Sequence, residues 1–355
     1  MYVRCLAALA AASLMTACAI HPVPEDVTGL KTGDIVKQIR CETRDAARKI
    51  ILRELERLAV YGNNGTAQEL FATYAADQSQ MVGFNPELAF PGPSNKQVRN
   101  VFKAVYSTAI AYSFDLTMEE ANNLGSTLNF LGPWQNVFTL GVTGNGNRSR
   151  LNERTFTITD KFSFLLRELN TPKPPYGSYC DGRIVGPNYI YPIAGQIGVY
   201  NTAYTFFELA FFENLAPDRT AAGSDSPPLG DKLTFTTNFD LSATPKVVFA
   251  QVGPGFQVAD ASATGVLSRK DTHQVTVGLA MEPAGALAVS SLTGFVFSGA
   301  GLSGPQFVAG RPRVAQTVKL NRVVGTAASR AELLALYVVD QLKSREVQLV
   351  PLGAR

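Results

Sequence analysis

The feature that most constrains the fold is a change in the spacing of apolar residues at Tyr106. Between Asp34 and Tyr61 apolar residues recur every three to four positions, as on one side of a helix. From Tyr106 to Met118 large residues instead occupy every second position and alternate with small or polar ones, as in a strand. Helical and strand patterns in separate blocks predict an α+β fold.

The remaining elements follow from local signals. Further helices are predicted from Thr66 to Ala76, from Ser94 to Tyr106, from Ile193 to Leu215, and from Ser329, with Glu332 completing its cap, to about Leu342. Further strands are predicted at 126–131, 136–143 and 154–159, with a turn at Gly144-Asn145-Gly146-Asn147, and a second strand block covers about 233–281. The prediction is therefore N-terminal helices, antiparallel strand units and a C-terminal helix.

The two strand blocks resemble each other. Phe114-Asp115-Leu116 recurs as Phe239-Asp240-Leu241, and Leu131-Gly132-Pro133 recurs as Val252-Gly253-Pro254. We interpret this as a diverged duplication whose units pack face to face as in a sandwich, with chance similarity as the alternative. The predicted division is a signal peptide (1–17), a tether (18–30), helices with the first strand unit (31–215), a linker or loop (216–231) and the second unit with the last helix (232–355).

The first twenty residues predict where the protein is located. Arg4 precedes an apolar run from Leu6 to Leu14, which is too short to span a bilayer and is typical of a secretory signal. The stretch Met15-Thr16-Ala17-Cys18 resembles the lipobox of bacterial lipoprotein precursors, with Met15 where that family usually has leucine. The resemblance implies acylation of Cys18 and an anchor on the periplasmic side of the outer membrane. Ordinary cleavage near Ala17-Cys18-Ala19, giving a soluble periplasmic protein, is the alternative.

Two cysteines remain after processing, Cys41 and Cys180. The helical pattern places Cys41 on the polar side of its helix, away from the apolar stripe, and an oxidising compartment favours a disulfide between the two over a pair of unpaired thiols. Neither these cysteines nor the two histidines, His21 and His273, show the spacing of metal ligands. We therefore expect no metal and no cofactor.

Candidate catalytic residues are few. Ser268, Asp271 and His273 lie close together and could supply a hydrolytic triad, although Ser-Arg-Lys-Asp-Thr-His is also typical of a polar hairpin turn. Glu119 and Glu120 would face opposite sides of a strand. Gly299-Ala300-Gly301-Leu302-Ser303-Gly304 matches a dinucleotide fingerprint, but Pro305 follows at once, and the next acid is Glu332.

The composition excludes other classes. Charged residues make up 17% of the chain and the net charge of +3 is not clustered, so no nucleic-acid partner is expected. We expect a non-enzymatic, membrane-anchored periplasmic lipoprotein, similar in layout to uncharacterised Gram-negative envelope lipoproteins, that serves as a scaffold or assembly factor with an envelope protein partner. The alternatives are a periplasmic hydrolase and a module that binds an apolar ligand between the two strand units.

Overall fold

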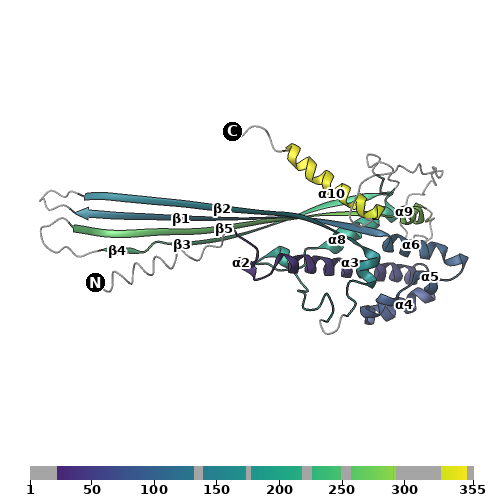
Figure 1. Ribbon diagram of the computed structural model, residues 1–355. Helices are drawn as coiled ribbons and strands as arrows, with labels where there is room; N and C mark the ends of the chain where they lie inside the picture. The colour runs from purple at the N-terminus through teal and green to yellow at the C-terminus, as the bar shows by residue number, and fades with distance from the viewer. Residues whose placement is uncertain are drawn as a thin grey trace. The chain divides into compact units, whose positions relative to one another are not determined.

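A computed structural model describes residues 22–131, 139–172, 177–217, 226–248, 257–290, 292 and 329–349. The predicted α+β class is confirmed, with N-terminal helices, an antiparallel sheet and a C-terminal helix (Figure 1). The α-helices are α2 (Glu25–Thr28), α3 (Thr32–Val60), α4 (Gly65–Ala76), α5 (Pro86–Ala89), α6 (Lys96–Tyr106), α7 (Phe162–Arg167), α8 (Val199–Phe212), α9 (Pro283–Ser290) and α10 (Arg330–Leu349). The 3-10 helices are η1 (Gln78–Gly83), η2 (Pro93–Asn95) and η3 (Pro192–Ala194). The strands are β1 (Thr108–Leu131), β2 (Thr139–Lys161), β3 (Pro228–Ala243), β4 (Lys246–Val248) and β5 (Gln257–Met281).

Both predicted strand blocks lie in one sheet of order β2-β1-β5-β3, with β4 also paired to β5. Asn129 of β1 bonds Asp260 of β5, and Ser268 of β5 bonds Ala121 of β1, as in an antiparallel pair. The sandwich-like packing predicted for the duplicated units is therefore wrong. Side-by-side pairing satisfies the backbone groups of β1 and β5 along both strands, which two separate sheets would leave as edges. Because the two strand blocks pair side by side, they also leave no space between them for the apolar ligand that the third alternative requires.

Two predicted turns are also wrong, because both lie inside long strands. Gly144–Asn147 belongs to β2 and Ser268–His273 belongs to β5. Cross-strand contacts override the local turn preference of these residues: a Cβ on Gly125 would lie 3.2 Å from Asn145 Oδ1, so glycine leaves room for the asparagine beside it.

The chain forms two compact units. Unit 1 comprises Met1–Lys31, Asp115–Arg154 and Phe235–His273, and unit 2 comprises Thr32–Phe114, Thr155–Thr234 and Gln274–Arg355. The boundaries cut through the long strands and do not follow the linker predicted at 216–231. Each unit is therefore built from segments that are distant in the sequence.

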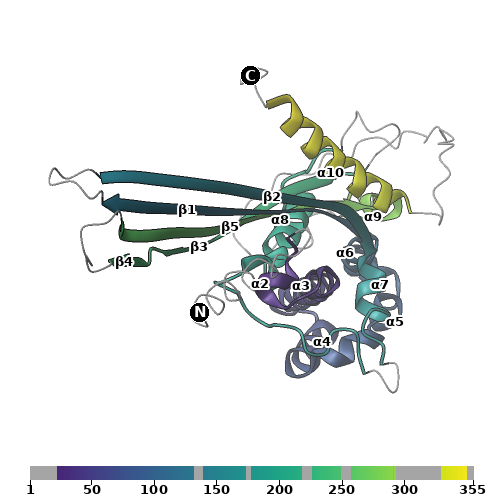
Figure 2. The same cartoon turned by 60° about the vertical axis from the view of Figure 1, so that its left-hand side comes forward.

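Helix α3 is the centre of unit 2, where α4, α6, α7 and α8 pack against it (Figure 2). Its apolar stripe is buried as predicted, but so are Glu42, Arg44 and Arg48 on its other sides. The polar side predicted to face solvent is thus covered around Cys41, whereas Lys49 and Glu56 farther along it are exposed. Some of the buried charged groups have partners: Glu42 accepts backbone hydrogen bonds and Arg44 pairs with Asp45 at 3.8 Å.

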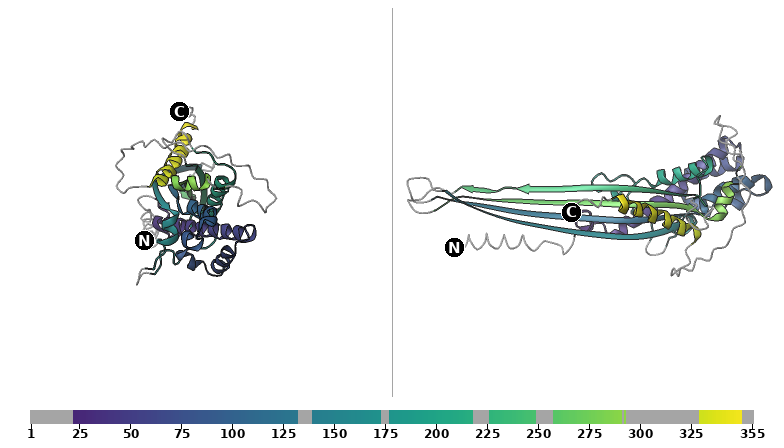
Figure 3. Two further views of the ribbon diagram at one scale, coloured as in Figure 1. Left: turned by 90° about the vertical axis from the view of Figure 1, so that its right-hand side faces the viewer. Right: turned by 90° about the horizontal axis from the view of Figure 1, so that it is seen from above.

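The last helix packs on the other side of the sheet of unit 2 (Figure 3). Ala335 and Val339 of α10 contact Ala111 and Ala280 of the strands. A Cβ on Gly278 would lie 2.2 Å from the Ala335 carbonyl oxygen, so this close approach requires glycine. The helix begins with the predicted capping box, in which the backbone nitrogens of Ser329 and Glu332 donate to each other's side chains at 2.8 and 3.3 Å.

Candidate anchoring site and contact face

A buried arginine organises unit 1 around the start of the described chain. The side chain of Arg269 on β5 is 9% exposed, and its Nε and Nη2 donate to the two carboxylate oxygens of Asp271 at 2.8 and 3.0 Å. Its Nη2 also donates to the Val23 carbonyl oxygen at 2.7 Å. Its Nη1 contacts Glu120 on β1 at 3.3 Å and Asp26 on α2 at 3.5 Å. We call these five residues, Val23, Asp26, Glu120, Arg269 and Asp271, the Arg269 cluster.

The segment predicted to be an extended tether is therefore docked. Asp26 Oδ2 accepts a hydrogen bond from the backbone nitrogen of Val23 at 2.8 Å, which closes the turn that starts α2. The carbonyl oxygen of Pro22 accepts a hydrogen bond from Asn152 of β2 at 2.7 Å. With the bond from Arg269 to Val23, residues 22–28 are held to two strands of unit 1. The chain is thus fixed to the sheet only four residues after Cys18.

The candidate triad residues do not converge. Asp271 and His273 share a strand face with Arg269, but Ser268 lies on the opposite face and donates to the Ala121 carbonyl oxygen at 3.4 Å. His273 Nε2 is 4.0 Å from Asp271 Oδ2. Burial lowers the pKa of His273 to about 4, while Asp271 opposes this and Arg269 adds to it. At neutral pH the imidazole is a buried neutral group beside an ion pair, and Ser268 lies on the opposite face of the strand.

Sequence reasoning named Asp271 and His273 but missed Arg269, which makes the principal contacts. The available signal was the alternation of Arg269, Asp271 and His273 along a strand, which puts a cation, an anion and an imidazole on one face. The turn interpretation of these residues concealed that alternation. Of the adjacent acids, Glu119 is exposed, whereas Glu120 contacts Arg269.

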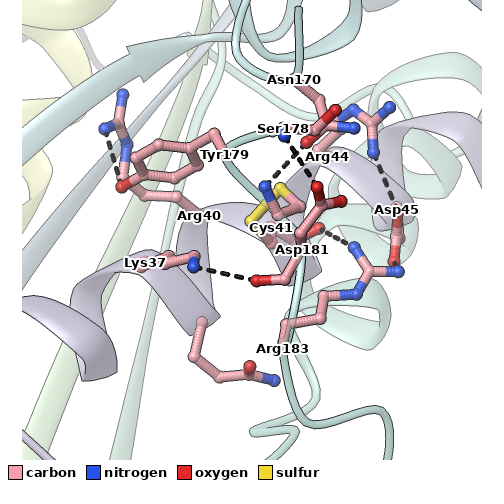
Figure 4. The surroundings of a disulfide bond; sticks show 12 residues. Lys37, Arg40, Cys41, Arg44, Asp45, Asn170, Ser178, Tyr179, Asp181 and Arg183 are labelled. Carbon is pink, nitrogen blue, oxygen red and sulfur yellow. Dashed lines mark hydrogen bonds and ion pairs between the residues drawn. A yellow bond between two sulfur atoms is a disulfide. The ribbon is translucent and has the colours of Figure 1, made fainter. Parts of the chain in front are cut away.

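The predicted disulfide between Cys41 and Cys180 is confirmed, with Cα atoms 5.7 Å apart in unit 2 (Figure 4). Polar contacts on both sides of it fasten the same segment to α3. Lys37 donates to the Asp181 carbonyl oxygen at 3.0 Å, and Arg183 pairs with Asp45. The backbone nitrogen of Cys180 donates to Asn170 Oδ1 at 2.7 Å. The bridge is therefore one of several links between α3 and the segment that covers its polar side.

A small pocket on α3 is lined by acids and bases but has a structural explanation. Glu42 lies in its wall, and its carboxylate accepts hydrogen bonds from the backbone nitrogens of Ile197, Gly198 and Val199 at 2.8, 2.7 and 2.8 Å. Burial raises the pKa of Glu42, and these three bonds oppose the rise. The carboxylate thus serves the first turn of α8, as an acid at a helix N-terminus does. The described residues include no cluster of three or more metal-ligating side chains.

The face of the sheet that carries Arg269 is apolar farther along the strands of unit 1. Cross-strand neighbours define the faces: Gly125 adjoins Asn145, Asn129 bonds Asp260, and Val247 pairs with Ala261. Alternation from these contacts and from the Arg269–Glu120 pair puts five exposed apolar side chains on the Arg269 side. They are Leu124 (61% exposed), Leu128 (40%), Val142 (48%), Val247 (53%) and Leu267 (51%), and we call them the apolar face.

The opposite face of the same strands is mainly polar. Its described side chains include the amides and hydroxyls of Asn123, Thr127, Asn129, Thr143, Asn145, Asn147, Ser262 and Thr264, with Val248 and Val266 as apolar exceptions. The sheet in unit 1 is therefore two-sided. Polar residues are expected on a solvated face, whereas exposed leucine and valine side chains on the other face call for a contact.

The aromatic residues of α8 pack in the core, with Phe206, Phe207 and Phe211 each no more than 2% exposed. Cys18, Trp134 and the glycine motif Gly299–Gly304 lie outside the described residues. Among the described helices, none is both long enough and apolar enough to cross a membrane.

Comparison with known proteins relates this chain to an uncharacterised group. Residues 21–288 match the family described as "Uncharacterised protein y4kA". The "Uncharacterized protein y4kA" of Sinorhizobium fredii is 33% identical over 289 residues, which cover 78% of this chain and 82% of that protein. A chain from the cryo-EM structure of the ETEC pilotin–secretin AspS–GspD complex shows 8% identity over 56% of this chain and 55% of that chain. Its TM-score of 0.19 is too low to support an argument about fold or function.

Proposed function

This chain belongs to the y4kA family, and we propose that it is a non-enzymatic lipoprotein of the cell envelope, attached to the periplasmic side of the outer membrane through Cys18 and acting as a scaffold or assembly factor. The observation that carries the proposal is the docking of residues 22–28 by Arg269 and Asn152. A disulfide in unit 2 agrees with an oxidising compartment such as the periplasm.

The docked segment would limit the distance between the lipid anchor and the sheet of unit 1. Three residues separate Cys18 from Pro22, and the four residue-to-residue steps between them can span at most about 14 Å when fully extended. A lipid on Cys18 would then be held close to the sheet of unit 1 and not at the end of a long flexible linker. Such a short connection fixes which part of the protein stands next to the membrane, and a scaffold needs that fixed orientation to present its other surfaces to a partner.

A hydrolytic function has no comparable support among the described residues. Ser268 faces away from His273, and the carboxylate of Asp271 is engaged by Arg269. The Ser268→Ala and His273→Gln variants, expressed separately in a deletion strain, are expected to restore the wild-type phenotype fully. Loss of complementation by either stably folded variant would favour the hydrolase.

The anchor is tested by metabolic labelling with palmitate. The wild-type chain should carry the label, and the Cys18→Ser variant should not. Label on Cys18→Ser would refute acylation at this position. The scaffold role is tested by crosslinking in cells followed by purification: a defined envelope complex should be recovered with the wild-type chain and reduced with Cys18→Ser. Recovery of the wild type as a monomer alone would contradict a scaffold.

A further inference from the structure

We propose that the apolar face, Leu124, Leu128, Val142, Val247 and Leu267, lies against the acyl chains of the membrane to which Cys18 is attached. The inference rests on the proposed anchor, because it concerns the same membrane. It assigns a lipid surface as the partner of unit 1.

The strand segments that carry the apolar face contain almost no charge. Residues 121–131 and 139–147 have no Asp, Glu, Lys or Arg, whereas such residues make up 17% of the whole chain. Residues 241–248 and 257–267 contain one charged residue each, Lys246 and Asp260. These two pair with each other at 3.8 Å, and Asp260 also accepts a hydrogen bond from Asn129 at 2.7 Å. Both belong to the polar face. Arg148 has the same alternation as Val142 and lies at the end of the apolar face nearest Arg269, where its charge can stay hydrated, while the positions around Leu128, Val142 and Val247 carry no charge to desolvate.

The apolar side chains are spread across neighbouring strands. Leu128 of β1 and Val142 of β2 are on adjacent strands of the sheet, and Ala261 of β5 pairs directly with Val247 of β4. With each of the five side chains at least 40% exposed, the patch is broad. Ser126 shares this face, and its hydroxyl donates to the Gly144 carbonyl oxygen within the sheet, so it is engaged there and not directed to polar groups of a protein partner. A fluid apolar phase needs no such groups.

The position of the docked N-terminal segment indicates what covers the apolar face. Arg269 extends from the same side of the sheet as the apolar face, and its guanidinium holds Val23 and α2 on that side. Pro22 is bonded to Asn152 on that side of the sheet, and Cys18, four positions before it in the sequence, can be at most about 14 Å away. The lipid on Cys18 would bring a bilayer to the face that has the exposed apolar groups.

The depth of this contact is limited by the sheet edges. Strands β2 and β3 are the two ends of the order β2-β1-β5-β3, and the backbone groups of an edge strand must stay hydrated or paired. We therefore place the sheet at the interface, with the apolar face toward the acyl chains and its edges at the level of the head groups.

Tryptophan fluorescence tests which face meets the lipid. In a Trp134→Phe background, which removes the only native tryptophan, a single tryptophan is introduced as Val142→Trp on the apolar face or as Thr143→Trp on the polar face. The chain from residue 18 with Cys18→Ser is mixed with vesicles of phosphatidylcholine and phosphatidylglycerol whose acyl chains carry bromine. Bromine should quench Val142→Trp strongly and Thr143→Trp weakly. Equal quenching at the two positions, or none, would overturn the proposal.

A second pair of variants tests the affinity. Leu124→Asn with Leu128→Asn should weaken vesicle binding about tenfold or more, because each side chain transfers roughly half its apolar surface to lipid. The matched control, Thr127→Asn with Thr143→Asn on the polar face, should bind as the wild type does. Equal binding by the two double variants contradicts the lipid contact. Circular dichroism and the intact disulfide establish that each variant is folded.

These measurements separate the possible failures. Because the vesicle experiments use Cys18→Ser, their outcome does not depend on acylation, and palmitate labelling tests the anchor independently. In the absence of lipid, the emission of Val142→Trp could shift to the blue as the protein concentration rises. If bromine in added vesicles then fails to quench it, the apolar face belongs to a contact with a second copy of the chain, and the lipid surface is refuted.

Discussion

The Arg269 cluster supports a quantitative prediction. Replacing Arg269 by Met keeps much of the aliphatic packing but removes the guanidinium from Asp271, whose side chain has no exposed surface. Both carboxylate oxygens lose donors at 2.8 and 3.0 Å, and burial prevents water from replacing them. Breaking a buried ion pair on one side costs about 3–5 kcal/mol, and the Val23 carbonyl loses a bond worth roughly 1 kcal/mol more. We expect Arg269→Met to lower the free energy of unfolding by about 4–6 kcal/mol.

Urea unfolding measures this loss, and hydrogen exchange at residues 23–28 measures release of the docked segment. The double variant Arg269→Met/Asp271→Leu distinguishes the two effects, because it removes both charges. Its stability should return to near that of the wild type, since the buried carboxylate is gone, while the segment stays unprotected. A single variant within 1 kcal/mol of the wild type, or a double variant whose segment stays protected, would refute the role assigned to Arg269.

Three further predictions concern stability. Replacing both Cys41 and Cys180 by Ala should cost about 5 kcal/mol in urea unfolding, because the bridge closes a loop of 139 residues; a loss below 1 kcal/mol would show that the polar contacts alone hold the segment. Since the pKa of His273 falls from 6.5 to about 4 on folding, the unfolded chain takes up the proton first, and about 3 kcal/mol should be lost as the pH falls from 6.5 to 4. In urea unfolding at pH 7 and 4.5, His273→Gln should abolish this contribution, and an unchanged difference would contradict it. Burial raises the pKa of Glu54 to about 7 against the opposing Arg57, so about 3 kcal/mol should be lost as the pH rises from 4.5 through 7. Thermal unfolding at pH 5 and 8 should show a smaller decline for Glu54→Gln than for the wild type, and an equal decline would refute the assignment.

The elements that periodicity predicts are those with one buried face. The stripe from Ile35 to Leu58 gave α3 nearly to the residue, and the alternation after Tyr106 gave the start of β1. What could not be predicted was the length of the strands, because residues 141–147 are all exposed and their Gly and Asn residues favour turns. Only pairing with β1 makes that stretch a strand, and pairing between distant segments is not recorded in local composition.

The disulfide was predicted correctly from a partly wrong premise. Cys41 was expected to face solvent, but a segment distant in sequence covers that side of α3, and the same segment supplies Cys180. The cover could not be seen from the helical wheel, because Arg44 and Arg48 on that side are residues that normally mark a solvated surface. Arg269 was not predicted for a related reason: its significance comes from Val23 and Asp26, which are 246 and 243 residues away in the sequence.

The lack of charge in residues 121–131 and 139–147 separates a membrane contact from a merely exposed sheet. Soluble proteins protect long exposed strands with lysine, proline or inward-pointing charges, because unprotected edges and apolar faces associate. Here Arg148 and Arg150 occur in β2, yet residues 139–147 just before them have no charged residue and no proline. A lysine in place of Val142 would give the usual protection, and because valine is half-exposed there and makes no side-chain hydrogen bond, the sheet itself permits it. A contact with acyl chains forbids it, because a charge there would have to be desolvated. Residues 139–147 could face either water or acyl chains. Of these two environments, only acyl chains explain why the segment has no protecting lysine.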